Sequence, residues 1–216
     1  MYQQPPLRGQ HTRGFPISDL IKLVTDQLGG GGLAALAGMI GSDEQKTSSA
    51  LTSTLGVLTG ALARNSEEEQ GAAALDAALE KDHDGGILSD IGGFLGKAAA
   101  GPGLGVLGHV LGSKQEPVAE EIAKDSGLDI GQVMTLMTTA APLLMGALGS
   151  KKKEEGLDAG GIAGLLAGEK QQVEQQSGLG SLLGMLGGGS STSDSGGGSL
   201  LSKVGGLLGG FLGRGK

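Results

Sequence analysis

The stretch 113–149 constrains the fold most strongly, because it predicts two consecutive helices joined by a tight turn. The run Ser113–Glu116 (SKQE) matches a capping box, in which the first and fourth residues cap each other's backbone amides. Pro117 suits the first turn of the helix that follows. Gly127 favours the left-handed residue that ends a helix, and Asp129 suits the N-cap of the next helix.

The second of these helices carries the longest apolar pattern at helical spacing, from 130 to 148. We expect it to be buried on most sides and to end near Gly149. Pro142 should bend it, because the proline ring displaces the carbonyl four residues earlier. The hydroxyl of Thr138 or Thr139 could then satisfy the freed backbone group.

Three methionines on this helix allow two interpretations: Met134, Met137 and Met145. Methionine is flexible and fills irregular gaps in a core, but it also lines adaptable partner surfaces. We favour the core for this spacing and keep Met134 and Met137 as candidate interaction residues.

The remainder of the first 170 residues also predicts helices. Ser18 can cap a helix, and the runs 42–45 (SDEQ) and 66–69 (SEEE) match two further capping boxes. No run of alternating β-branched residues competes with this pattern. The sequence therefore predicts an all-α, compact multi-helix domain.

Two halves of the chain show a weak internal similarity. Residues 40–42 (IGS) resemble 111–113 (LGS), and Gly-Ala-Leu ends a predicted helix at 60–62 and again at 146–148. We interpret this as a degenerate internal duplication. It would build one helical domain over 17–168, preceded by a disordered N-terminal arm at 1–16.

The C-terminal region, 169–216, is a Gly/Ser/Leu-rich tail of low complexity. It holds a polar hinge at 171–176 and two short amphipathic segments, 178–186 and 199–213, separated by the linker 187–198. Both segments could lie on a membrane surface, with the cations of the second toward headgroups and its apolar residues inserted. The tail residues that we regard as candidate contacts are Leu207, Leu208 and Phe211.

Composition excludes several classes of function. The chain has no cysteine, and its formal net charge of −7 argues against a nucleic-acid partner, since phosphate binding needs a basic surface. We find neither an N-terminal secretory signal nor a run of apolar residues long enough to predict a membrane-spanning helix. The expected location is therefore the cytoplasm.

One acidic run suggests metal chemistry. Glu80, Asp82 and Asp84 occupy the first, third and fifth positions of a calcium loop of the EF-hand type, followed by glycine at the sixth position. The twelfth position is Ile91 instead of the required glutamate, although Asp90 is adjacent. The alternative is a glycine-rich turn between helices, with Asp90 as an N-cap.

The segment 108–149 resembles the signature of the bacterial YidB-like proteins, which form domain of unknown function 937. The run 79–90 (LEKDHDGGILSD) and the Leu/Gly-rich tail also resemble that family, and the similarity extends over roughly 18–168. The resemblance implies a bacterial, compact, all-helical domain. It implies no enzyme, no cofactor and no defined ligand.

No phosphate-binding loop, nucleophile elbow or zinc-binding His-Glu-x-x-His motif occurs in the chain. We therefore expect a protein without enzymatic activity or a small-molecule substrate. The leading hypothesis is a helical interaction or scaffold module that self-associates. A peripheral membrane protein that acts through the tail and a calcium-binding helical protein are the alternatives.

The core assignment predicts that Met137→Asp unfolds the domain, because it places an unpaired charge among Leu and Met side chains. Deletion of 187–198 should leave the melting temperature unchanged, since a Gly/Ser linker contributes no core. Helical circular dichroism during heating measures the melting temperature of both altered proteins. A Met137→Asp protein that melts like the wild type would contradict the core assignment.

Overall fold

The structure is a computed structural model that describes residues 18–29, 31–82, 85–96, 103–175, 180, 183 and 184. This part of the chain is helical and contains no strand, which confirms the all-α prediction. The helices are α1 (Asp19–Gln27), α2 (Gly32–Ile40), α3 (Glu44–Asn65), α4 (Glu69–Asp82), α5 (Gly86–Ser89), α6 (Ile91–Leu95), α7 (Gly103–Leu111), the 3-10 turn η2 (Gly112–Lys114), α8 (Gln115–Ser126), α9 (Ile130–Glu155) and α10 (Ala159–Glu174).

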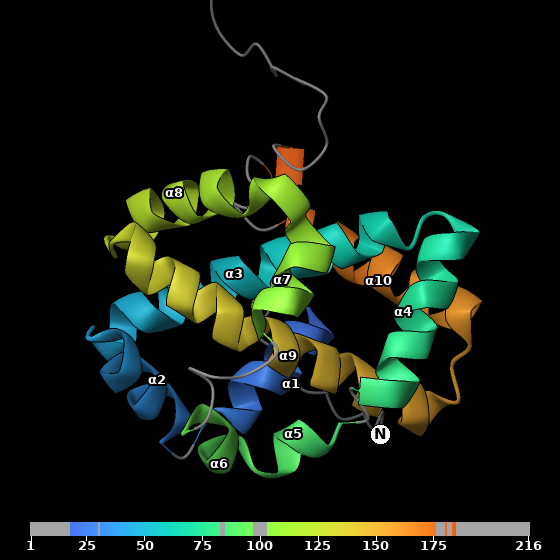
Figure 1. Cartoon of the computed structure of the whole chain (residues 1–216), viewed down its shortest axis with the longest axis horizontal. Helices are drawn as coiled ribbons and strands as arrows, with labels where there is room; N and C mark the ends of the chain where they lie inside the picture. Colours follow the sequence, from blue (N-terminus) through green and yellow to red (C-terminus); the bar gives the residue numbers. More distant parts are fainter. Residues whose placement is uncertain are drawn as a thin grey trace, which may run out of the picture.

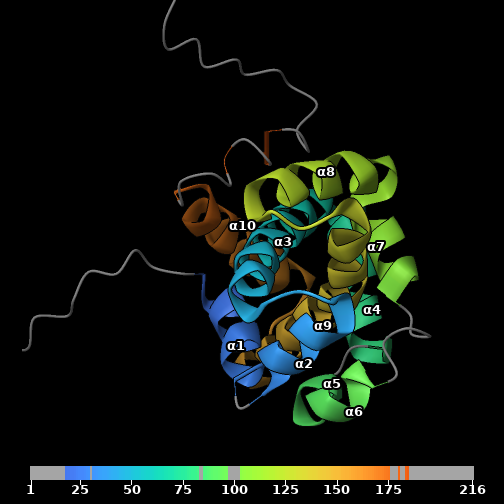
Figure 2. The same ribbon diagram turned by 90° about the vertical axis from the view of Figure 1, so that its left-hand side faces the viewer.

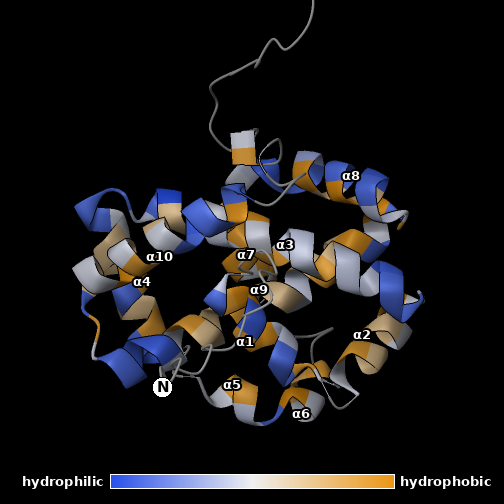
Figure 3. Cartoon of the chain, turned by 180° about the vertical axis from the view of Figure 1, so that it is seen from behind, coloured by the Kyte–Doolittle hydropathy of each residue, from blue (hydrophilic) through white to orange (hydrophobic). Residues whose placement is uncertain are grey.

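Helix α9 is the centre of the fold, as its apolar pattern predicts. It contacts α1, α2, α3, α4, α5, α7 and α8. In Figures 1 and 2, α8 lies at the top of the molecule and α5 and α6 at the bottom, with α3 and α9 between them. Figure 3 shows hydrophobic residues concentrated where α1, α7 and α9 meet, and hydrophilic residues on the outer turns of α8. Met137 is fully buried, which confirms its assignment to the core.

Close contacts around α9 depend on residues without side chains. A Cβ atom on Gly103, at the start of α7, would lie 1.9 Å from the Thr138 carbonyl oxygen. That carbonyl is the one that Pro142 deprives of its helical donor. The hydroxyls of Thr138 and Thr139 donate instead to the carbonyls of Met134 and Thr135, so the compensation we expected does not form. The backbone of α7 at Gly103 packs against the Thr138 carbonyl.

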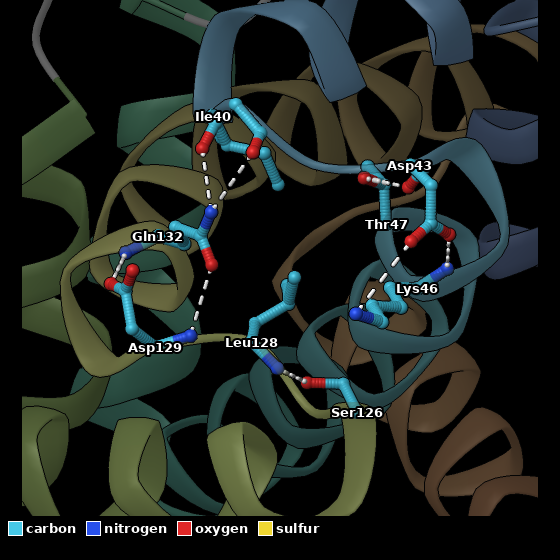
Figure 4. A network of polar contacts seen from close by, with 9 residues as sticks. Ile40, Asp43, Lys46, Thr47, Ser126, Leu128, Asp129 and Gln132 are labelled. Atoms are coloured by element: carbon cyan, nitrogen blue, oxygen red, sulfur yellow. Dashed lines mark hydrogen bonds and ion pairs between the residues drawn. The ribbon is translucent and has the colours of Figure 1, made fainter.

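The start of α9 is held by a capping box that also closes α2 (Figure 4). The Gln132 amide N–H donates to the Asp129 carboxylate at 2.8 Å, and the Asp129 amide donates to Gln132 Oε1 at 2.9 Å. Gln132 Nε2 then donates to the carbonyls of Ile40 at 3.0 Å and Gly41 at 3.3 Å, at the end of α2. Asp129 therefore caps α9 as predicted, while Gln132 joins two helices that are distant in sequence.

The three predicted capping boxes do not form. The turn η2 precedes α8, and Ser113 lies inside that turn. The N-cap of α3 is Asp43 instead of Ser42, whose amide donates to the Ala37 carbonyl and closes α2. Ser66 closes α3, since its hydroxyl donates to the Leu62 carbonyl at 2.9 Å. Ser42 and Ser66 therefore each close the preceding helix and do not cap the helix that follows.

Helix α9 continues past the predicted end at Gly149 and stops at Gly156, which has a left-handed φ of 65°. The predicted domain boundary after 168 and the start of the predicted hinge at 171 both fall inside α10. Glu169 of α10 is buried and accepts hydrogen bonds from the Ser18 hydroxyl and, at 3.3 Å, from the Leu20 amide. The C-terminal helix is thereby fastened to the first helix. The internal duplication stays a prediction.

The contact at Gly103 predicts opposite effects for two substitutions in the same helix. Gly103→Ala forces its methyl group into the Thr138 carbonyl and should destabilise the domain by about 1–3 kcal/mol. Gly105→Ala meets nothing within 4 Å and should stabilise it by up to about 1 kcal/mol, because alanine favours helix. Urea denaturation measures the free energy of unfolding of both variants. Equal stability of the two would contradict the close packing of α7 on α9.

Candidate functional site

A groove with a volume of about 1330 Å³ lies between α4 and α7. The end of α3 and Met145 of α9 complete its lining. The apolar residues of the lining are Leu62, Ala74, Leu75, Ala78, Val106, Val110 and Met145. The polar ones are Arg64, Asn65, Glu67, Glu68, Gln70, Asp82 and His109. An apolar surface bordered by polar groups is typical of a site that binds another molecule.

Asn65 fixes one end of the groove. Its side-chain Nδ2 donates to the carbonyls of His109 at 3.4 Å and Val110 at 3.1 Å, so the end of α3 is bonded to the last turn of α7. A Cβ atom on Gly71 would lie 1.7 Å from the Asn65 carbonyl oxygen, which shows how closely α4 begins against the same residue. Asn65 therefore contacts both walls of the groove, α4 and α7.

Lys152 holds the α4 wall of the groove, because its ion pairs join α9 to α4. Its ammonium lies 2.5 Å from Asp76 and 2.7 Å from Glu80, and its side chain is only 13% exposed. Hydrogen bonds to Asp76 and then to Glu80 raise the pKa of Lys152 above its ordinary value of 10.5. Lys170 of α10 adds a more exposed ion pair with Glu67 at 3.1 Å.

The charges in the groove are of both signs. Glu68 and Asp82 line it, and among the described residues neither carboxylate belongs to an ion pair. Arg64 also lines it, and the buried Nη1 of its guanidinium has no hydrogen-bond partner.

The candidate interaction residues are not brought together. Met137 has no exposed surface, and Met134 is half-buried against the core. Leu207, Leu208 and Phe211 lie outside the described residues. The membrane interpretation of the tail therefore stays a prediction. The groove itself was not predicted, because its lining comes from four separate helices and no local pattern marks it.

The described residues of the acidic run lie in α4 and at the N-cap of α6. Glu80 and Asp82 belong to α4, Asp84 lies outside the described residues, and Asp90 accepts the Gly93 amide at 2.9 Å as the N-cap of α6. Glu80 is already paired with Lys152. Within the described ranges, no group of three or more metal-ligating side chains is positioned to hold an ion. Calcium binding stays a prediction.

Helix α9 is the one described helix long and apolar enough to cross a membrane, which our sequence analysis did not anticipate. Its apolar window is 78% buried inside the fold, as expected for the core helix of a folded domain. Length and composition alone do not separate these two cases; burial by seven neighbouring helices favours the core.

These features define a compact all-α domain with an open groove between two of its helices. The model of the family described as "Bacterial protein of unknown function (DUF937)" matches residues 22–151. Because this match covers more than half of the 216 residues, the chain belongs to that family. No curated protein and no solved structure matches the chain.

The ion pairs of Lys152 predict a dependence on pH. Since its pKa is raised in the folded state, its contribution to stability is complete below pH 10.5 and is lost as the pH rises through the folded pKa. Lys152→Met should lower the melting temperature at pH 7, and the difference from wild type should shrink above pH 10.5. Lys124→Met, which removes an exposed pair within α8, should have little effect. Equal melting of the two variants at pH 7 would contradict the assignment.

Proposed function

We propose that this protein is a non-enzymatic helical interaction module that self-associates, with the groove between α4 and α7 as its binding surface. The observation that carries the proposal is the combination of an apolar floor and charged edges in one hollow. Grooves of this composition bind amphipathic helices, whose apolar side chains enter the groove at intervals of three and four residues.

The chemistry of the lining supports binding over catalysis. Among the described residues that line the groove there is one histidine, His109, and there is no serine, threonine, cysteine or lysine. The lining therefore lacks the hydroxyl, thiol or amine that serves as the nucleophile in serine-, threonine-, cysteine- and lysine-dependent enzymes. The charged groups at the edge of the groove would orient a bound partner.

Size-exclusion chromatography with light scattering tests the proposal. We expect the mass of the wild-type protein to increase with concentration from monomer toward dimer. Ala74→Glu places a charge in the groove and should weaken association at least about tenfold, which is roughly 1.4 kcal/mol.

Ala77→Glu is the matched control. Ala77 is exposed on the same helix and does not line the groove, so the added charge is equal and its effect on association should be small. A wild-type protein that remains monomeric at all concentrations, or equal effects of the two substitutions, would overturn the proposal.

A further inference from the structure

We propose that the groove binds the C-terminal segment 199–213 of this same protein as an amphipathic helix, within one molecule at low concentration and by exchange between copies at high concentration. The inference rests on the proposed function and adds the identity of the bound segment. The segment lies outside the described residues, so the argument uses its sequence and the described surface that would receive it.

The apolar pattern of the segment suits a groove. Leu200, Val204, Leu207, Leu208 and Phe211 recur at intervals of three and four residues, which places them on one face of a helix. Glycine and serine occupy most of the other positions. Because such a helix is marginal in isolation, it forms only where its apolar face is covered. The floor of the groove is apolar and supplies that cover.

The cations of the segment are complementary to the acidic residues of the groove, which outnumber its one arginine. The segment and the three residues after it contain Lys203, Arg214 and Lys216 and no acid. Glu68 and Asp82 line the groove, and among the described residues neither forms an ion pair. Opposite charges at the edge of an interface fix the orientation of a partner and speed its association.

One described residue of the tail packs on α3 of the domain. Leu183 is 5% exposed and packs on Gly60 of α3, where a Cβ atom would lie 2.0 Å from its Cδ2 atom. Leu183 ends a Gly-Ser-Leu-Leu run at 180–183, and the same four residues recur at 198–201. The last leucine of the first copy of this motif thus packs on α3.

The remaining chain is long enough to reach the groove. Gly60 is five residues before Asn65 at the groove's edge, about 8 Å along the helix. Residues 185–198 form a Gly/Ser-rich connection whose root-mean-square span is about 20 Å. A tether of this length gives an effective concentration on the order of millimolar, which favours docking within one molecule unless the protein is concentrated.

The absence of cysteine from the chain makes a cross-linking experiment specific. The test variant combines Ala74→Cys in the groove with Leu208→Cys in the segment, and the control combines Ala77→Cys with Leu208→Cys. Both α4 positions are exposed, so their thiols are equally available to oxidant. We expect the disulfide-linked monomer to form at least about tenfold faster in the test variant, and the linked dimer to increase with concentration.

A third protein adds Phe211→Asp to the test pair. It removes an anchor from the segment without touching the described fold, so circular dichroism should be unchanged while the cross-linking rate falls to that of the control. Equal rates for the Ala74 and Ala77 pairs would overturn the inference, as would linked dimers without linked monomers in dilute protein. If association still depends on Ala74 while the cross-links do not, the proposed function stands and the bound segment is another one.

Discussion

The close burial of α9 is the constraint on which the rest of this structure depends. A core with few aromatic residues gains its apolar contact from small and aliphatic side chains, so neighbouring helices must approach closely. Gly103 allows α7 to rest on the Thr138 carbonyl, and Gly146 has no room for a Cβ atom, which would lie 2.3 Å from the Ile87 methyl carbon. Glycine in these helices sacrifices helix propensity and permits contacts that no other residue allows.

Polar groups at the helix ends decide how the surrounding helices are arranged. Gln132 completes the cap of α9 and also donates to the carbonyls at the end of α2, so one side chain bonds the two helix ends together. Glu169 reaches from α10 to the first turn of α1, where its buried carboxylate accepts donors at the positive end of the helix dipole. Both residues connect segments more than 90 positions apart, and both close the domain around α9.

The groove follows from the same architecture. Helix α4 is held at its start by the Gly71 contact and along its length by Lys152, whereas no described helix fills the space between α4 and α7. The described part of the chain thus keeps an open groove with an apolar floor. Its own tail supplies a segment with matching apolar spacing and opposite charge, which is why we infer that binding and self-association use the same hollow.

The sequence by itself determined the class of fold, the burial of α9, the caps at Ser18 and Asp129, and the left-handed glycine at 127, because each follows from spacing or from a single residue's chemistry. Only the tertiary structure decided the roles of Ser42 and Ser66, which close the preceding helices. It also decided that α9 continues to Glu155, and that Leu62, Leu75, Val106 and Met145 share a groove. A serine at a helix boundary can bond in either direction, and an apolar residue at helical spacing can face a core or a groove; the neighbouring helices make that choice.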